Sequence, residues 1–334
     1  MITEAPRRME PADWRRELRD AWTRPADLLA WLGLTPAAVG LSAAAAAGFP
    51  LRVPRHYAGR MRRGDATDPL LRQVLPVVAE ESGGPGDRLD PVGDLASARA
   101  PGLLRKYRGR ALLVTTGACA VHCRYCFRRH FPYAEHNPAA DGYAGALAAI
   151  AADPSIDEVI LSGGDPLVLD DRRLAGLARA LGAIPHVRRL RIHSRVPIVL
   201  PARVDGALLD WLGASRLRIV VVVHANHPRD VDADVAAALL ELRAAGATVL
   251  NQSVLLRGVN DDADVLAALR ERLADAGALP YYLHALDRVR GAAHFEVPDD
   301  EARALVAAVR DRLPGYLVPR LVREVEGAAS KVPL

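Results

Sequence analysis

The three cysteines of this 334-residue chain lie close together, at Cys119, Cys123 and Cys126. The C-x3-C-x2-C pattern supplies three thiolates, which favour iron–sulfur clusters or zinc. On a four-iron cluster, three thiolates leave one iron without a protein ligand, and that open iron can bind a small molecule. Zinc would need a fourth ligand, for which His122 or His130 is available, but structural zinc usually uses two paired knuckles. The pattern therefore favours a [4Fe–4S] cluster over zinc.

Lysine is almost absent from the chain. Of its 44 basic residues, only Lys106 and Lys331 are lysines. Arginine can replace lysine on a surface, but it cannot act as a nucleophilic amine at neutral pH. Both lysines are therefore candidates for amine chemistry, with survival by chance as the alternative.

The composition is that of a folded protein, with 50% hydrophobic and 25% charged residues. The net charge is +4, but the arginines are scattered rather than gathered in a patch with aromatic residues. This disfavours a nucleic-acid partner and favours an anionic cofactor or substrate. We also expect no membrane association and a cytoplasmic location, because no run reaches ~18 apolar residues and the start lacks a signal-peptide core.

The first part of the chain, up to about residue 105, is expected to be helical with irregular joins. Helical spacing of apolar residues covers 13–32, and Thr35-Pro36 is typical of the start of a further helix. Residues 65–101 are rich in Gly, Pro and Asp, which predicts an irregular segment on the surface of another part.

From residue 110 onward, short apolar strands alternate with amphipathic helices. The predicted strands are 111–115, 158–162, 190–193, 218–224, 248–254 and 281–284, and the predicted helices are 143–152, 171–182, 206–212, 232–245 and 262–276. A repeat of roughly thirty residues implies parallel strands with right-handed crossovers. The predicted fold is α/β, a partial (β/α)6 TIM-like barrel at 106–298, with a helical N-terminal region at 1–105 and a C-terminal helix and tail at 299–334.

Chemically suggestive residues follow the predicted strands, at the end where such barrels keep their active site. The cysteine loop follows the first strand and Gly163-Gly164-Asp165 the second. Ser194 and Arg195 end the third strand, Gln252 lies within the fifth, and Asp287 follows the sixth. The simpler alternative for the two glycines is a plain strand-to-helix turn.

The cysteine pattern after the first strand of such a repeat resembles the signature of the radical S-adenosylmethionine (SAM) superfamily. The longer string 119–133 is similar to lysine 2,3-aminomutases, and most closely to the branch that makes (R)-β-lysine for modifying elongation factor P. The similarity continues through 161–166, 193–197, 251–260 and the tail, and thus covers nearly the whole chain.

This resemblance implies a [4Fe–4S] cluster on the three cysteines, whose open iron binds SAM. An electron from a flavodoxin- or ferredoxin-type donor would then cleave SAM to a 5′-deoxyadenosyl radical. Gly163 and Gly164 would let the backbone approach the methionyl part of SAM, and Asp165 would accept a hydrogen bond from its amino group. Ser194 and Arg195 would hold the ribose and carboxylate, with an inter-strand salt bridge as the alternative for Arg195.

The resemblance also implies pyridoxal 5′-phosphate (PLP), bound covalently by Lys331 in the segment 324–331. Arg110 is the expected phosphate contact, Tyr107 would lie near the ring, and Gln252 is a weaker candidate for the phosphate. The alternative to a phosphate site is that Arg110 belongs to a basic strand edge that only contacts solvent. The Gly-Ala-Ala-Ser before Lys331 departs from the glycine run of the lysine-degrading enzymes and favours the elongation factor P branch.

For the substrate, the resemblance implies that Arg128 pairs with the α-carboxylate of L-lysine in bidentate geometry. Asp287 and Glu324 would neutralise the ε-ammonium, and Glu326 is close enough in sequence to compete with Glu324. The expected protein is an isomerase that makes (R)-β-lysine and feeds a lysyl-ligase pathway to elongation factor P. Two alternatives stay open: a related aminomutase for another amino acid, and a non-enzymatic iron–sulfur or zinc-binding module.

Overall fold

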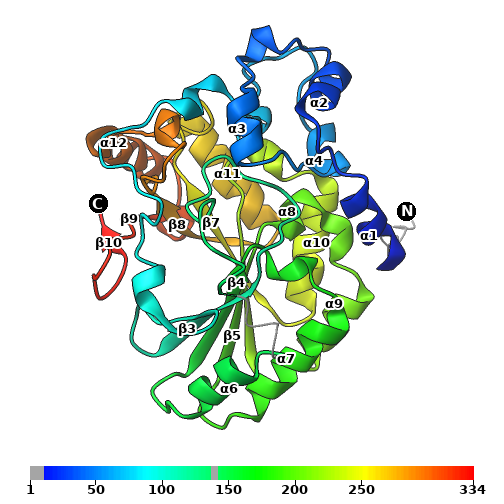
Figure 1. Cartoon of the computed structure of the whole chain (residues 1–334), viewed down its shortest axis with the longest axis vertical. Coiled ribbons are helices and arrows are strands. Elements are labelled where there is room, and N and C mark those ends of the chain that lie inside the picture. Colours follow the sequence, from blue (N-terminus) through cyan, green and yellow to red (C-terminus); the bar gives the residue numbers. More distant parts are fainter. Residues whose placement is uncertain (1–10, 137–141) are drawn as a thin grey trace.

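The structure, a computed structural model, describes residues 11–136 and 142–334. A single curved sheet forms its centre, with helices packed on the outer face and an N-terminal group of helices at one end (Figure 1). The strands are β1 (Ala98–Ala100), β2 (Leu103–Leu104), β3 (Arg110–Thr116), β4 (Glu158–Gly163), β5 (Arg189–Ser194), β6 (Arg218–Val223), β7 (Thr248–Val254), β8 (Leu279–His284), β9 (Arg320–Arg323) and β10 (Val332–Pro333). They pair in chain order, β3 to β9 in parallel, while β1, β2 and β10 add antiparallel edges.

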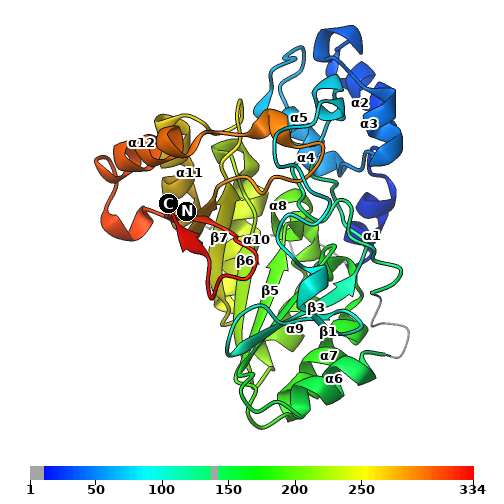
Figure 2. The ribbon, with the colours of Figure 1, turned by 60° about the vertical axis from the view of Figure 1, so that its left-hand side comes forward.

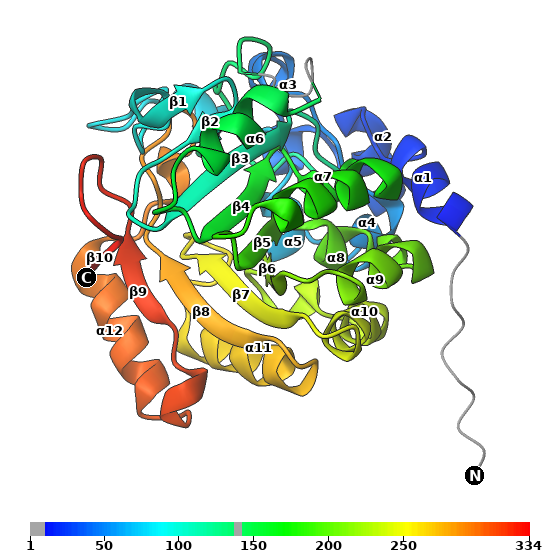
Figure 3. The same cartoon turned by 90° about the horizontal axis from the view of Figure 1, so that it is seen from below.

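The helices between the parallel strands cover the outside of the sheet (Figure 3). The α-helices are α1 (Pro11–Arg19), α2 (Pro25–Leu32), α3 (Ala43–Gly48), α4 (Arg55–Gly59), α5 (Pro69–Arg72), α6 (Ala144–Ala151), α7 (Asp171–Ala183), α8 (Val196–Val199), α9 (Gly206–Gly213), α10 (Ala233–Ala244), α11 (Ala263–Asp275) and α12 (Asp299–Arg310). Among them, no helix of the described residues combines the length and apolar character that a membrane span requires.

Aspartates fix the starts of four outer helices. Asp170, Asp205, Asp232 and Asp262 each precede a helix, and each side chain accepts a hydrogen bond from a backbone N–H of its first turn. Such a cap satisfies a donor that has no partner inside the helix. Each of these four helices therefore begins at a defined residue, and this fixes where the preceding loop ends.

Strand β4 is buried on both faces, whereas β5 and β7 alternate between buried and less buried residues. All six residues of β4 are buried, and β6 is a run of one isoleucine and four valines after Arg218. Leu161, Ile192 and Val221 belong to one hydrophobic core that extends into the N-terminal helices at Leu28 and Leu70. The N-terminal region therefore packs on the barrel through shared apolar contacts.

The six predicted strands and five predicted helices are confirmed, and the partial barrel with them. The sequence analysis missed β9, a seventh parallel strand, because its four residues begin and end with arginine and give no long apolar run. The helical stretch predicted over 13–32 is two helices, because Pro25 begins α2 at its first turn. Thr35-Pro36 precedes only a short 3-10 turn that ends at Gly40, which has a φ of 60°.

Figure 2 shows the N-terminal helices standing against the loops at one end of the sheet. Glu80 connects this region to the cysteine loop. Its carboxylate accepts hydrogen bonds from Nε of the fully buried Arg124 at 2.8 Å and from Nη2 of Arg129 at 2.7 Å. Two guanidiniums thus depend on one buried carboxylate.

We predict that Glu80→Gln destabilises the protein by about 3–5 kcal/mol, because it leaves buried positive charge without its partner. Chemical denaturation of the metal-free protein measures the change. The exposed neighbour Glu81→Gln is the control and should cost well under half as much. An unfolding midpoint for Glu80→Gln that equals the wild-type value would contradict this role.

Candidate active site

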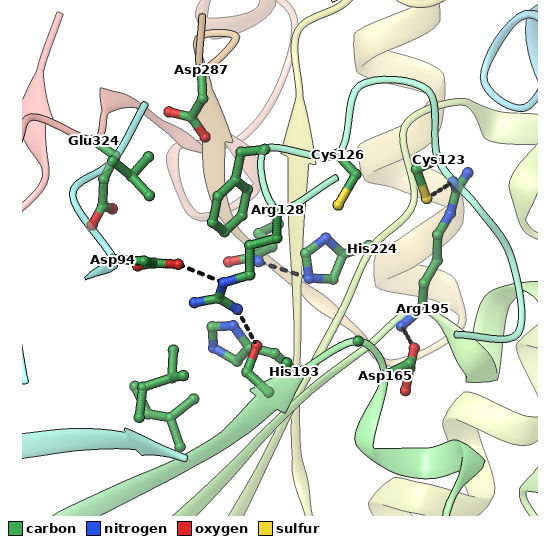
Figure 4. A pocket seen from close by; sticks show the side chains of 18 of the residues that line it. Asp94, Cys123, Cys126, Arg128, Asp165, His193, Arg195, His224, Asp287 and Glu324 are labelled. Carbon is green, nitrogen blue, oxygen red and sulfur yellow. Dashed lines mark hydrogen bonds and ion pairs between the residues drawn. The ribbon is translucent and has the colours of Figure 1, made fainter. Parts of the chain in front are cut away.

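A cavity of about 470 Å³ lies where the parallel strands β3 to β8 end. The residues that the sequence analysis assigned to the cluster, SAM, PLP and lysine line it, apart from Glu326: the three cysteines, Gly163, Gly164, Asp165, Ser194, Arg195, Tyr107, Arg110, Arg128, Gln252, Asp287, Glu324 and Lys331. Figure 4 shows the cavity in two parts. Asp94, Asp287 and Glu324 lie on one side, and Cys123, Arg195 and Asp165 lie on the other.

The three thiols are partly buried, unpaired in disulfides, and face this common cavity. Burial raises the pKa of Cys126 to about 11 and that of Cys119 well above its usual value. Bound iron reverses this effect, because metal coordination deprotonates a thiol. Within 11–136 and 142–334, no three Cys, His, Asp or Glu side chains converge on one point that could hold a single ion. Ligands of a multi-iron cluster bind different irons and need no such point, so the thiols fit a cluster.

The two glycines at the end of β4 let β3 and the cysteine loop lie directly against the strand end. Gly163 has a φ of 121°, and a Cβ there would lie 2.6 Å from the carbonyl oxygen of Thr116. A Cβ on Gly164 would lie 2.2 Å from the carbonyl oxygen of Ala118, far inside a van der Waals contact. The sequence analysis explained both glycines by the approach of SAM. In the structure, the end of β3 fills this space at Gly163, and the start of the cysteine loop fills it at Gly164.

Asp165 is buried and its carboxylate already accepts four hydrogen bonds. One oxygen accepts from Ser194 Oγ at 2.6 Å and Leu167 N at 3.1 Å, the other from Arg195 N at 2.7 Å and Val196 N at 3.2 Å. Burial raises its pKa to about 6, and these hydrogen bonds oppose the rise. Asp165 therefore fixes the end of β5, and the predicted hydrogen bond from the amino group of SAM would be a further one on this carboxylate.

Arg195, held by this carboxylate through its backbone, presents its guanidinium to the cysteine side of the cavity. Nη1 lies 2.8 Å from Cys123 Sγ, and Nη2 donates to Gln73 Oε1 at 2.6 Å and Tyr57 Oη at 3.1 Å. Its Nε is buried and has no hydrogen-bond partner in the described part of the chain. A fixed cation with a spare donor beside Cys123 fits an anionic group next to the cluster, such as the carboxylate of SAM.

The opposite side of the cavity holds groups that fit PLP. The amine of Lys331 forms an ion pair with Glu324 and lies 5.7 Å from the ring centre of Tyr282. The guanidinium of Arg110 lies 4.9 Å from the Tyr107 ring centre, and its buried Nε has no partner among the residues described. A reactive amine and an unsatisfied cationic donor in one cavity are what an aldehyde with a phosphate requires.

Two carboxylates reach the same side. Desolvation raises the pKa of Asp287 to about 7, although Lys331 opposes the rise. Burial also acts on Glu324, but Lys331 outweighs it and holds the pKa of Glu324 below its usual value. Glu326 lies outside the cavity lining and pairs with Arg88 at 3.2 Å. Glu324, which also accepts from Tyr107 Oη at 2.7 Å, is therefore the acid that faces the site.

Arg128 lies between the two parts of the cavity (Figure 4). It is buried, and donates from Nε to Asp94 Oδ2 at 2.6 Å and from Nη1 to Ser162 Oγ at 2.9 Å. The sequence analysis missed Asp94, because this residue lies in a Gly- and Asp-rich stretch without a motif. It named Lys106 only as a candidate for amine chemistry, and in the structure the ammonium of Lys106 lies 2.7 Å from Asp94 Oδ1.

Three histidines with neutral side chains also line the cavity between its two parts. Burial lowers the pKa of His224 to about 3 and those of His193 and His284 well below the usual value. The side-chain amide nitrogen of Gln252 lies 2.7 Å from His224 Nε2. These side chains add hydrogen-bonding groups without adding charge.

Comparison with known proteins agrees with this geometry. The family described as the radical SAM superfamily matches residues 113–269. An L-lysine 2,3-aminomutase of Escherichia coli (strain K12) is 50% identical over 323 residues, which cover 96% of this chain and 94% of that protein. The chain belongs to the lysine 2,3-aminomutase family.

Other members of this family are similar over nearly the whole chain. The L-lysine 2,3-aminomutase of Haemophilus influenzae is 43% identical, and the matched residues cover 99% of this chain and 98% of that protein. That of Clostridium subterminale is 31% identical, with 96% of this chain and 77% of that protein covered. Membership identifies the protein as a radical SAM isomerase and implies a [4Fe–4S] cluster, SAM and PLP as cofactors.

We predict that Cys119→Ala, Cys123→Ala and Cys126→Ala each prevent assembly of the four-iron cluster, because the chain has no spare thiol. Iron and sulfide analysis after anaerobic reconstitution measures the loss, together with SAM cleavage. His122→Ala is the control and should retain iron, since a fourth protein ligand is not needed. A cysteine variant with a full cluster and turnover would refute the ligand assignment.

We predict that Lys331→Ala loses the visible absorbance of covalently bound PLP while its iron content stays unchanged. The reason is that Lys331 and Lys106 are the chain's only lysines, and Lys331 is the one in the segment 324–331 that resembles the PLP-binding segment of the family. Borohydride reduction followed by peptide mapping locates the adduct in the wild type. Finding the PLP label on Lys106 would require the site to be reassigned.

Proposed function

We propose that this aminomutase converts L-lysine to (R)-β-lysine by moving the amino group from C2 to C3. The observation that carries the proposal is the placement of Asp287 and Glu324 in the same cavity as Lys331 and Arg128. An ammonium at the end of an aliphatic chain needs such carboxylates, because an unpaired charge in an enclosed site costs several kcal/mol. The relatives named L-lysine 2,3-aminomutase support the same substrate.

In this proposal the chain positions the substrate at both ends. Arg128 binds the α-carboxylate, and Asp287 and Glu324 bind the ε-ammonium. Lys331 holds PLP covalently, and Arg110 neutralises its phosphate, with Tyr107 beside the ring. When bound, the cluster and SAM supply a carbon radical that takes and returns a hydrogen atom, and PLP supplies the carbonyl that carries the migrating nitrogen.

The cysteine side of the cavity has its own binding groups. Arg195 offers an unsatisfied buried donor to the carboxylate of SAM, and Ser194 lies beside it for the ribose. Asp165 keeps both in place through the hydrogen bonds to Ser194 Oγ and to the backbone of Arg195. Apolar residues, including Phe49 and Val121, complete this side and limit the access of water.

The proposal extends to the cellular context. We infer that a flavodoxin- or ferredoxin-type protein in the cytoplasm supplies the electron, and that β-lysine goes to a lysyl-ligase pathway for elongation factor P. The Gly-Ala-Ala-Ser sequence before Lys331 supports this branch. A related aminomutase that acts on an uncharged amino acid is the second candidate, and the two carboxylates argue against it.

The test is anaerobic reconstitution with iron, sulfide, SAM, PLP and dithionite, followed by incubation with L-lysine and product analysis. The expected product is β-lysine, with SAM recovered rather than consumed in proportion to product. A fully loaded protein that cleaves SAM but leaves lysine unchanged, while converting another amino acid, would contradict the proposal.

We predict that Asp287→Asn weakens lysine binding by roughly 2–5 kcal/mol if the pair is well desolvated, with far less effect on SAM cleavage. The substitution keeps size and hydrogen bonding but removes the charge. Glu324→Gln should act in the same direction. Apparent lysine affinity is compared with that of norleucine, which lacks the ammonium.

Glu326→Gln is the matched control, because Glu326 pairs with Arg88 outside the cavity. It should leave lysine affinity unchanged. If Asp287→Asn binds lysine as tightly as wild type and gains nothing for norleucine, the ammonium is held elsewhere.

A further inference from the structure

Lys106 lines the same cavity as Lys331, so both lysines of the chain lie in the active site. The proposed function gives Lys331 a task but gives Lys106 none. The chain has 44 basic residues, and subtracting the two lysines leaves 42 arginines. A lysine retained here needs a physical reason that arginine cannot satisfy.

The ammonium of Lys106 has three partners, two from the segment before β1 and one from the segment after β9. It lies 2.7 Å from Asp94 Oδ1, donates to the Val92 carbonyl oxygen at 2.7 Å, and lies 3.5 Å from Glu324 Oε1. A compact ammonium has three diverging donors, whereas a guanidinium is longer and planar. The arrangement therefore explains why lysine rather than arginine occupies this position.

Asp94 is shared between two cations. One oxygen pairs with Lys106 and the other accepts from Arg128 Nε at 2.6 Å, and the side chain is only 2% exposed. Burial acts to raise the pKa of Asp94, but Arg128 and Lys106 outweigh it and hold the pKa below its usual value. One unscreened negative charge thus interacts with both cations.

This sharing decides how much positive charge Arg128 can offer to a ligand. With Lys106 present, part of the Asp94 charge is neutralised on the side away from Arg128. Without Lys106, Asp94 would neutralise Arg128 alone and would repel an incoming carboxylate. Arg128 would still lie in place, but its attraction for a substrate anion would fall.

We infer that Lys106 is a positioning residue that keeps Arg128 available for the α-carboxylate of the substrate by neutralising Asp94. The inference rests on the proposed function, because it requires an amino-acid substrate whose carboxylate binds Arg128. Lys106 thereby sets specificity for substrates that carry this carboxylate, although it does not contact the substrate itself.

The experiment uses Lys106→Met in the enzyme loaded with cluster, SAM and PLP. The KM for lysine should rise on the order of tenfold with little change in kcat. The binding of norleucine, which keeps the carboxylate, should weaken by a similar factor in an assay that follows the visible absorbance of PLP. The probe 1,5-diaminopentane keeps both amines but lacks the carboxylate, and its affinity should change less than about twofold. Arg105→Met is the matched control, because its partner Asp153 lies outside the cavity lining.

Adding Asp94→Asn to Lys106→Met should restore lysine affinity, because no negative charge then competes for Arg128. Equal weakening of 1,5-diaminopentane and lysine, or no recovery in the double variant, would overturn the inference. If Lys106→Met does not fold, Asp94→Asn alone decides: the lysine KM should not rise, and a rise overturns the inference. Wild-type enzyme that does not convert lysine contradicts the proposed function, whereas active wild type with an unchanged Lys106→Met contradicts only the role of Lys106.

Discussion

The cost of keeping carboxylates out of water governs this active site. Asp94, Asp287 and Glu324 line one cavity, and each would be unfavourable there as an isolated anion. In the structure, Lys106, Lys331 and Arg128 supply the opposing charge. Covalent attachment of PLP would remove the ammonium of Lys331 from this balance. In the proposed function, the ε-ammonium of lysine would then pair with Glu324 and Asp287.

The fold makes this balance possible by bringing distant segments to one end of the sheet. Three different parallel strands position these groups: the cysteine loop follows β3, Arg195 follows β5, and Gln252 lies within β7. The N-terminal region adds Asp94 from a loop before β1. The segment after β9 adds Glu324 and Lys331, and β10 pairs back onto β9 to hold that segment in place. Cofactor side and substrate side are thus built from different parts of the chain.

Local sequence patterns predicted much of this arrangement. The period of strands and helices predicted the partial barrel, and the cysteine spacing and the rare Lys331 identified the two cofactor sides. Sequence could not show that the Asp165 carboxylate accepts four hydrogen bonds within the protein, because three of the donors come from the end of β5 and the start of α8. Likewise, the pairing of Asp94 with Lys106 and Arg128 is a long-range contact without periodic signal. Whether Glu324 or Glu326 faces the cavity depends on the path of the C-terminal tail. The sequence does not show this path, because two similar acids lie on either side of Val325.

The most direct test of the charge balance is proton release when a ligand binds the PLP-loaded protein. The ligand 6-aminohexanoate carries a carboxylate and the distal ammonium but no α-amine, so it cannot form the imine at the α-carbon that lysine forms with PLP. Since desolvation raises the pKa of Asp287 to about 7, binding of the ammonium at pH 6 should expel about one proton from this carboxyl. Calorimetry in buffers of different ionisation enthalpy measures that number. The account predicts release of close to one proton in wild type and none in Asp287→Asn, whereas equal release from both would contradict it.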